Sequence, residues 1–311
     1  MGKQKQKIYN PDPKNKIKSN NWQFWAIIAL PMIYAIVFAY IPMGGIIIAF
    51  KDYSIRKGIL GSSWVGLKYF KQFLTSPSSV LVIKNTFILG IYTLIANFPI
   101  PILLAIAINE IGNRKFKKTM QMVTYAPYFI SVVVLVGMMM QMMDLRTGII
   151  NVLLQKVGID AINFFGDAGI FRHLYVWSGV WQTAGYSSII YVAALAGVSP
   201  ELQEAAIVDG ATRVQRILHV DIPAIMPTVI IMLIFNCSNI VSIGMDKIYL
   251  MQNSLNTSVS EVISTFVYKV GVVNSNFSYS TAAGLFQSIV AFALLVIVNQ
   301  ICKKVTETSL W

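Results

Sequence analysis

Residues 198–223 read VSPELQEAAIVDGATRVQRILHVDIP, a polar stretch that lies between two long apolar segments. Its composition favours helix rather than a plain loop, but it is too polar to cross a membrane. Gly210 permits a sharp bend, because glycine adopts backbone conformations that other residues avoid. We therefore expect a short helix over 201–208, a bend, and a second helix over 211–220, with Pro223 starting the next apolar segment.

The apolar segments on either side place the chain among membrane proteins. Of its 311 residues, 56% are hydrophobic and 12% are charged, whereas soluble domains carry about 25% charged residues. The mean hydropathy is +0.63. A membrane-spanning helix needs about 20 mainly apolar residues, and a helix satisfies its own backbone polar groups in lipid. The sequence predicts six such helices, at 22–50, 83–109, 119–143, 173–197, 224–250 and 281–301.

The net charge of +12 has a membrane explanation. No soluble domain is left to carry a nucleic-acid-binding face, whereas basic residues commonly flank membrane spans on the cytoplasmic side. Residues 1–20 hold six lysines and helix-breaking residues at 10–13, so we expect a disordered cytoplasmic tail before a membrane domain at 21–311. This tail and the basic cluster at 114–118 bias one side of the predicted topology. We therefore expect both termini in the cytoplasm.

Cysteine and histidine are too sparse to suggest a metal centre. Cys237 and Cys302 lie in apolar stretches, as buried free thiols would, and His173 and His219 are far apart in the sequence. We expect no disulfide framework, no metal ion, no bound cofactor and no catalytic residue.

The polar stretch carries a recognisable motif. It contains, in order, Glu204-Ala205-Ala206, then Gly210, then Val220-Asp221-Ile222-Pro223. This spacing resembles the EAA motif of ABC-importer permeases, which reads Glu-Ala-Ala, three residues, Gly, nine residues and Ile-x-Leu-Pro. Val220 stands in place of the isoleucine and Ile222 in place of the leucine. Without the resemblance, the stretch would be read as an ordinary amphipathic helix at the membrane interface.

The resemblance extends over nearly the whole chain. It is similar to the permeases of carbohydrate-uptake ABC importers, in the LplB/YteP branch for complex oligosaccharides and polysaccharide fragments. The shared stretches are Tyr40-Ile-Pro-Met43, Ala49-Phe-Lys-Asp-Tyr53, Trp64-Val-Gly-Leu67, Asn109-Glu110, Ser187-Ser-Ile-Ile-Tyr191, Phe277-Ser-Tyr279, Gly284-Leu-Phe286 and Ser309-Leu-Trp311. The resemblance implies an all-α, polytopic type I (MetI-like) permease fold with a cytoplasmic coupling helix, in a bacterial cell membrane.

The resemblance also implies partners. The chain has no G-x-x-x-x-G-K phosphate loop, so ATP and Mg²⁺ would be bound by two separate ATPase subunits. In the family, the EAA loop docks into a cleft on the ATPase, which assigns coupling roles to Glu204, Ala205, Ala206, Asp209 and Gly210. A second, homologous permease and an external sugar-binding protein would complete the importer. Loops 51–82, 144–172 and 251–280 would receive the binding protein, unless their aromatic residues serve only packing.

Polar residues inside the predicted spans are candidates for substrate contact, because such residues are costly in lipid. Tyr186 and Asn239 are expected at similar depth, roughly 27 and 24 Å from the coupling stretch at 1.5 Å per residue. Asn236, Asn239 and Ser242 share one helix face. In maltose-type permeases, the positions that resemble Tyr186, Asn239 and Ser242 line the sugar site. Hydrogen bonding between helices is the alternative role. The lesser candidates are Trp181, Gln182 and Gln287.

Three other functions remain open at this stage. The same fold could move another solute, although sparse charge within the spans argues against a small anion. A membrane-embedded enzyme would need a cluster of His, Asp or Ser at membrane depth, and the sequence shows none. A non-transporting membrane anchor for an ATPase would show no ATPase stimulation by sugar.

Overall fold

The computed structural model describes residues 22–306 and 309–310, which are mainly helical. The chain divides into two units, residues 1–47 and residues 48–311. In the first unit, α1 (Trp22–Ala35) continues through a π-helical turn, η1 (Ile36–Tyr40), into α2 (Ile41–Met43), and the 3₁₀ segment η2 (Gly44–Phe50) follows. The apolar run Phe24–Phe50 is long enough to cross a membrane, as predicted. The predicted tail at 1–20 lies outside the described residues.

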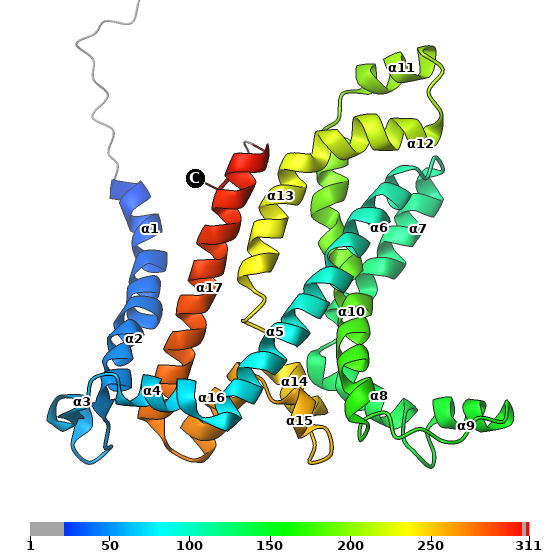
Figure 1. The fold of residues 1–311 in the computed structure, drawn as a ribbon. Coiled ribbons are helices and arrows are strands. Elements are labelled where there is room, and N and C mark those ends of the chain that lie inside the picture. The colour runs from blue at the N-terminus through cyan, green and yellow to red at the C-terminus, as the bar shows by residue number, and fades with distance from the viewer. Residues whose placement is uncertain (1–21, 307–308, 311) are drawn as a thin grey trace, which may run out of the picture. The chain divides into compact units, whose positions relative to one another are not determined.

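Long helices form the body of the second unit (Figure 1). They are α5 (Pro77–Asn97), α6 (Pro99–Asn109), α7 (Arg114–Tyr125) with the 3₁₀ turn η3 (Ala126–Phe129), α8 (Val132–Met142), α10 (Ala168–Ala196), α13 (Ile222–Ser238) and α17 (Phe277–Thr306). Helix α10 packs against α5, α6, α7 and α13, and α13 in turn packs against α17. The bundle is thus organised around α10.

Short elements gather at the two ends of this bundle (Figure 1). One end holds β1 (Lys51–Asp52), α3 (Gly58–Gly61), β2 (Ser63–Trp64), α4 (Lys68–Thr75), α9 (Ile149–Lys156), α14 (Met245–Met251), α15 (Thr257–Ser260), α16 (Ile263–Tyr268) and the π-helical η5 (Lys269–Val273). The other end holds α11 (Pro200–Val208), α12 (Arg213–Arg216) and the π-helical η4 (Ile217–Asp221).

Side-chain hydrogen bonds join the β1–β2 hairpin to α4 and α17. It is antiparallel, with Lys51 opposite Trp64. The Tyr69 hydroxyl donates a 2.7 Å hydrogen bond to the Asp52 carboxylate, and Ser278 Oγ of α17 donates to the Lys51 carbonyl at 2.7 Å. Burial of the phenol, together with the neighbouring Asp52 carboxylate, raises the pKa of Tyr69 to about 12. Tyr69 therefore remains a donor at physiological pH.

Fewer helices qualify as membrane spans in the structure than the six that the sequence predicted. Among the described residues, four helices are long and apolar enough to cross a membrane, and the bent pair of α7–η3 and α8 would be a fifth. The remaining predicted span, 173–197, lies within α10, whose 29 residues are long enough for a membrane but less apolar. This polarity is tolerated because α10 is surrounded by other helices, which supply partners for its polar groups.

The predicted helices differ from the structure in three places. The span at 119–143 is not straight, because the chain bends by 93° between η3 and α8. The span at 224–250 ends early, at Ser238, and irregular backbone over 239–244 precedes α14. Pro223 lies in the first turn of α13, as predicted, but α13 continues directly from α12 and η4, so that one helix runs through Arg213–Ser238. The π-helical turn η4 lies just before Pro223 and adjusts the backbone where proline lacks an N–H donor.

Candidate functional site

The bend in the EAA stretch is a Schellman motif. The backbone N–H of Gly210 donates to the Ile207 carbonyl at 3.0 Å, and that of Ala211 donates to the Ala206 carbonyl at 2.9 Å. Gly210 has φ +77°, in the left-handed region that side-chain-bearing residues rarely adopt. The glycine therefore ends α11 and turns the chain toward α12, as the sequence predicted.

The second arm of the bend starts with a capping box. Thr212 Oγ1 accepts from the backbone N–H of Gln215, and the Gln215 side chain accepts from the backbone N–H of Thr212. Arg213 then forms a 3.0 Å ion pair with Glu110, which lies between α6 and α7. Between the arms is a cleft of about 300 Å³, lined by Ala206, Asp209, Gly210, Ala211, Gln215, Arg216, His219 and Val220. The element is thus preformed and anchored at its α12 side.

The predicted coupling residues line the outer arm of this element. Glu204, Ala205, Asp209 and Gly210 are exposed, and Ala206 is half-buried. Within the described part of the chain, the Glu204 carboxylate has neither a hydrogen bond nor an ion pair. Helix α11 therefore presents an uncompensated negative charge beside small side chains, which would allow another helix or a cleft to approach closely.

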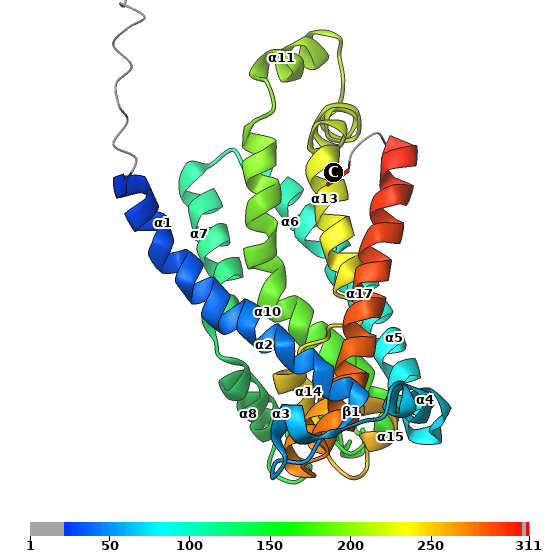
Figure 2. The same cartoon turned by 90° about the vertical axis from the view of Figure 1, so that its left-hand side faces the viewer.

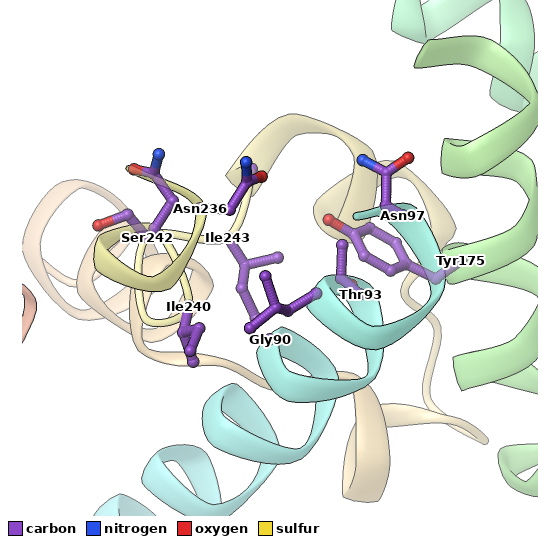
Figure 3. A pocket seen from close by; sticks show the side chains of 11 residues that line it. Gly90, Thr93, Asn97, Tyr175, Asn236, Ile240, Ser242 and Ile243 are labelled. Atoms are coloured by element: carbon purple, nitrogen blue, oxygen red, sulfur yellow. The ribbon is translucent and has the colours of Figure 1, made fainter. Parts of the chain in front are cut away.

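A second feature, a polar cavity of about 190 Å³, lies where α13 ends inside the bundle. Figure 3 shows Asn97 and Tyr175 on one side of this cavity, and Asn236 and Ser242 on the other. The full lining is Gly90, Thr93, Leu94, Asn97, Tyr175, Asn236, Asn239, Ile240, Ser242, Ile243 and Gly244. The cavity is therefore built from α5, α10, the last turn of α13 and the irregular segment that follows it.

Gly90 makes this architecture possible. A Cβ atom at residue 90 would lie 2.0 Å from the Ile240 carbonyl oxygen, so the irregular backbone packs directly on α5. Gln287 Nε2 on α17 donates to the Val241 carbonyl at 2.8 Å, which gives a buried carbonyl of the irregular segment a partner inside the bundle. The break in α13 is thus held by specific contacts rather than by solvent.

Several polar groups of the cavity are available to a ligand. Asn236 Nδ2 donates to the Met232 carbonyl at 2.7 Å and Asn239 Nδ2 donates to the Phe235 carbonyl at 3.0 Å, which leaves both amide oxygens as acceptors. Thr93 Oγ1 is buried and has no hydrogen-bond partner among the described residues. Buried polar groups normally have partners, so this cavity has the hydrogen-bonding capacity that a polar ligand would use.

Tyr175 is fixed in the cavity wall by a buried lysine. Lys247 of α14 is 8% exposed, and its Nζ donates to the Tyr175 carbonyl at 3.0 Å. The same ammonium lies 4.9 Å from the centre of the Tyr175 ring. This pair joins α14 to α10 beside the cavity.

The structure brings together only some of the predicted pathway residues. Asn236, Asn239 and Ser242 line the cavity, whereas Tyr186 lies outside it. The Tyr186 ring stacks on Tyr128 with ring centres 3.8 Å apart, in a more apolar hollow that also contains Met232. Asn236 follows Met232 by one helical turn, so this hollow is next to the cavity along α13.

The two lesser candidates of α10 also lie elsewhere. Trp181 lines an apolar hollow with Met138, Met139, Met142 and Met143. Gln182 is buried, and its Nε2 donates to the Ile130 carbonyl at 2.8 Å, at the bend between η3 and α8. Its contact is structural, because it satisfies a backbone group where the helix is broken.

Sequence reasoning missed the contribution of α5 to the cavity. Gly90, Thr93 and Asn97 are spaced by three and four residues, so they share one helix face. That spacing is the sequence signal that would have placed α5 at the cavity. Tyr175 gave no comparable signal, because aromatic residues are common at such positions.

Comparisons with known proteins agree with this architecture. Residues 97–307 match the model of the family described as "Binding-protein-dependent transport system inner membrane component". The polygalacturonan/rhamnogalacturonan transport system permease protein YteP of Bacillus subtilis is 40% identical over 95% of this chain and 92% of its own length. Protein LplB of the same organism is 38% identical, with the same two coverages.

A solved structure is similar over the same extent. One chain of a bacterial alginate ABC transporter, crystallised with a periplasmic protein that holds an alginate pentasaccharide, superposes with a TM-score of 0.86. It is 33% identical in sequence, and the match covers 93% of this chain and 97% of that one.

Proposed function

Because the chain belongs to the family of inner-membrane components of binding-protein-dependent transport systems and is a permease subunit of an ABC importer, we propose that it imports oligosaccharides or polysaccharide fragments by alternating access. ATP would be hydrolysed by separate ATPase subunits that bind α11. When these subunits close on ATP, they would displace α11, and the packed helices would rock between inward-facing and outward-facing states.

The observation that carries this proposal is the preformed bend at Gly210 together with Glu204, which is exposed and has no ion-pair partner among the described residues. Ala205 and Ala206 allow close approach, and Glu204 would pair with a basic residue of the ATPase. Asp209 lies at the end of α11 and would add to the negative charge that the ATPase meets. A rigid bent lever transmits displacement better than a flexible loop, which would absorb it.

The distribution of basic residues supports a cytoplasmic location for α11. The bundle end that holds α11 and α12 also holds the start of α7 and the end of α17 (Figure 1). Basic residues gather there, namely Arg114, Lys115, Lys117, Lys118, Arg213, Arg216, Lys303 and Lys304. With the six lysines of residues 1–20 they make 14 basic residues, against 11 on the other side of the predicted topology, and such a bias favours the cytoplasmic side. We assign the C-terminus to the cytoplasm, and the six lysines of residues 1–20 favour the same side for the N-terminus.

The substrate class is supported by the relatives and by the cavity. Two similar proteins bear names or titles that refer to polygalacturonan, rhamnogalacturonan or alginate. The cavity offers neutral amides, hydroxyls and an aromatic ring, which suit sugar hydroxyls and ring faces. Its volume of about 190 Å³ is below the about 300 Å³ of common small-molecule sites. It would therefore contact one part of a sugar chain at a time.

The complete importer would contain further subunits. We propose two ATPases, a second permease related to this one but different in sequence, and an external sugar-binding protein. Loops 51–82, 144–172 and 251–280 lie at the bundle end opposite α11 (Figure 1), where a binding protein would dock. Trp64 on this side is 63% exposed and stacks on Phe50, so it is a preorganised aromatic contact.

The proposal is tested with the full importer in proteoliposomes, using labelled oligogalacturonides and neutral oligosaccharides. Glu204→Lys should lower uptake at least about tenfold, the scale of a 1–3 kcal/mol coupling energy, while membrane insertion is unchanged. Glu204→Gln is compared with Glu201→Gln, which removes an exposed carboxylate from the first turn of the same helix. Wild-type uptake by Glu204→Lys would contradict the docking role.

The same assay separates the alternatives. Transport of an amino acid or inorganic anion in preference to every oligosaccharide would indicate the same fold with another solute. ATP hydrolysis that no sugar stimulates, without uptake, would indicate a membrane anchor for an ATPase.

A further inference from the structure

Among the described residues, Gln203 is the one residue of α11 whose side chain forms hydrogen bonds with the rest of the chain. Gln203 Nε2 donates a 2.7 Å hydrogen bond to Asp221 Oδ1, and Arg216 Nη1 donates a 3.2 Å hydrogen bond to Gln203 Oε1. Asp221 ends η4, directly before α13, and Arg216 ends α12. Both functional groups of the glutamine amide are therefore used, and both link α11 to the helix that begins at Arg213.

Nothing else among the described residues replaces this link. Helix α11 projects beyond the ends of α10 and α13 (Figures 1 and 2), and it has no extensive packing contact with another helix. Its other side chains form no hydrogen bond or ion pair with the described part of the chain. Without Gln203, no side-chain hydrogen bond or ion pair would join α11 to the other described residues.

Burial makes the link costly to break. Asp221 is 2% exposed, and a buried carboxylate is strongly unfavourable unless it is hydrogen-bonded or paired with a charge. Gln203 supplies the hydrogen bond, and Arg216 supplies a nearby positive charge. Displacement of α11 alone would strip Asp221 of its hydrogen bond, so α11 and the start of α13 should move together.

We propose that Gln203 is a positioning residue that transmits the displacement of α11 to α13 through Asp221 and Arg216. This role rests on the proposed docking of α11 to an ATPase. From Asp221, α13 runs to Ser238, roughly 26 Å at 1.5 Å per residue, and the irregular segment beyond it lines the cavity. The Glu204 side of α11 would thus meet the motor, while Gln203 conveys the motion to the substrate pathway.

An isosteric double-mutant cycle tests this link. Gln203→Glu places a carboxylate against the Asp221 carboxylate, so the two groups repel. Adding Asp221→Asn restores the contact with donor and acceptor exchanged, because the new amide at position 221 can donate to the new carboxylate at position 203. Arg216 can pair with that same carboxylate. Asp221→Asn alone keeps an acceptor for Gln203 and should be nearly neutral.

The expected readout is uncoupling rather than loss of assembly. Gln203→Glu should lower uptake at least about tenfold, while the ATPase still copurifies and hydrolyses ATP without stimulation by the loaded binding protein. The double variant should recover to within about threefold of wild type, which a simple surface role for Gln203 would not produce. If Gln203→Glu fails to insert, Gln203→Leu removes both hydrogen bonds without adding charge, and it should be uncoupled in the same way.

Three results would overturn the link: wild-type uptake with Gln203→Glu, wild-type uptake with Gln203→Leu, or equal impairment of Gln203→Glu with and without Asp221→Asn. The last result would mean that Gln203 contacts the ATPase directly. A wild-type permease that never binds an ATPase would instead contradict the proposed function, so the two failures are distinguishable.

Discussion

The buried polar groups near the two ends of the helix Arg213–Ser238 differ in whether they have hydrogen-bond partners. At one end, the buried Asp221 carboxylate has a hydrogen-bond donor and a nearby cation. At the other end, α13 stops inside the bundle, and the Thr93 hydroxyl beside it is buried without a partner among the described residues. The satisfied end suits the transmission of force, because its contacts hold one geometry. The unsatisfied end suits a ligand, because its groups gain hydrogen bonds only when something binds.

The two ends also differ in how they use glycine. Gly210 has φ +77° with open space around its Cα, so it is required by the backbone conformation. Gly90 is in an ordinary helix but has the Ile240 carbonyl where a Cβ would be, so it is required by packing. Substitutions at these positions should therefore fail in different ways.

The largest effect is expected at the cavity end. Gly90→Ala would place its Cβ 2.0 Å from the Ile240 carbonyl oxygen, and overpacking of this kind costs about 1–3 kcal/mol or more. We expect a clear loss of folded, monodisperse protein in detergent, measured by fluorescence-detected size exclusion. Gly137→Ala in α8, where no atom lies within 4 Å of the new Cβ, is the matched control. Equal behaviour of the two variants would show that the break in α13 is not packed as described.

An intermediate effect is expected at the surface end. Gly210→Val would force a β-branched residue into the left-handed region, at a cost of about 1–2 kcal/mol, and would distort the bend. The protein should insert and remain monodisperse, because Gly210 has no packed neighbour, but sugar uptake should fall several-fold. Gly112→Val, at another open position, should retain uptake. A folding defect in Gly210→Val would remove the proposed contrast with Gly90.

The smallest effect is expected from the cavity side chains. Asn239→Leu removes an acceptor without breaking a contact between helices, because its amide donates only within α13. The apparent KM for the sugar-loaded binding protein should rise about threefold, the equivalent of one hydrogen bond of about 0.7 kcal/mol, with little change in thermal stability. Tyr186→Phe, outside the cavity, should change KM less. A larger effect at Tyr186 than at Asn239 would indicate that the substrate passes through the neighbouring hollow instead of the cavity.

Much of the coupling end was readable from sequence. The helix at 201–208, the bend at Gly210 and the second helix depend on residues that are close neighbours in the chain, so local backbone preferences decide them. The contact between Gln203 and Asp221 escaped detection because the two residues are 18 positions apart and meet only after the chain reverses at Gly210. Neither residue is unusual by composition, so no local signal marked the contact.

The cavity end was decided by tertiary structure. Asn236, Asn239 and Ser242 could be grouped from helical spacing alone, yet Ser242 lies beyond the end of that helix. Apolar composition gives no sign that α13 stops at Ser238, because the residues that follow are apolar enough to continue a span. The helix ends there because Gly90 admits the Ile240 backbone and Gln287 gives the Val241 carbonyl a partner.

Sequence by itself determined that the chain forms long apolar helices and where the surface lever bends, since both follow from hydropathy and local conformation. Only packing between distant helices decided where irregular backbone could exist within the bundle, since its polar groups need partners that the segment itself does not contain.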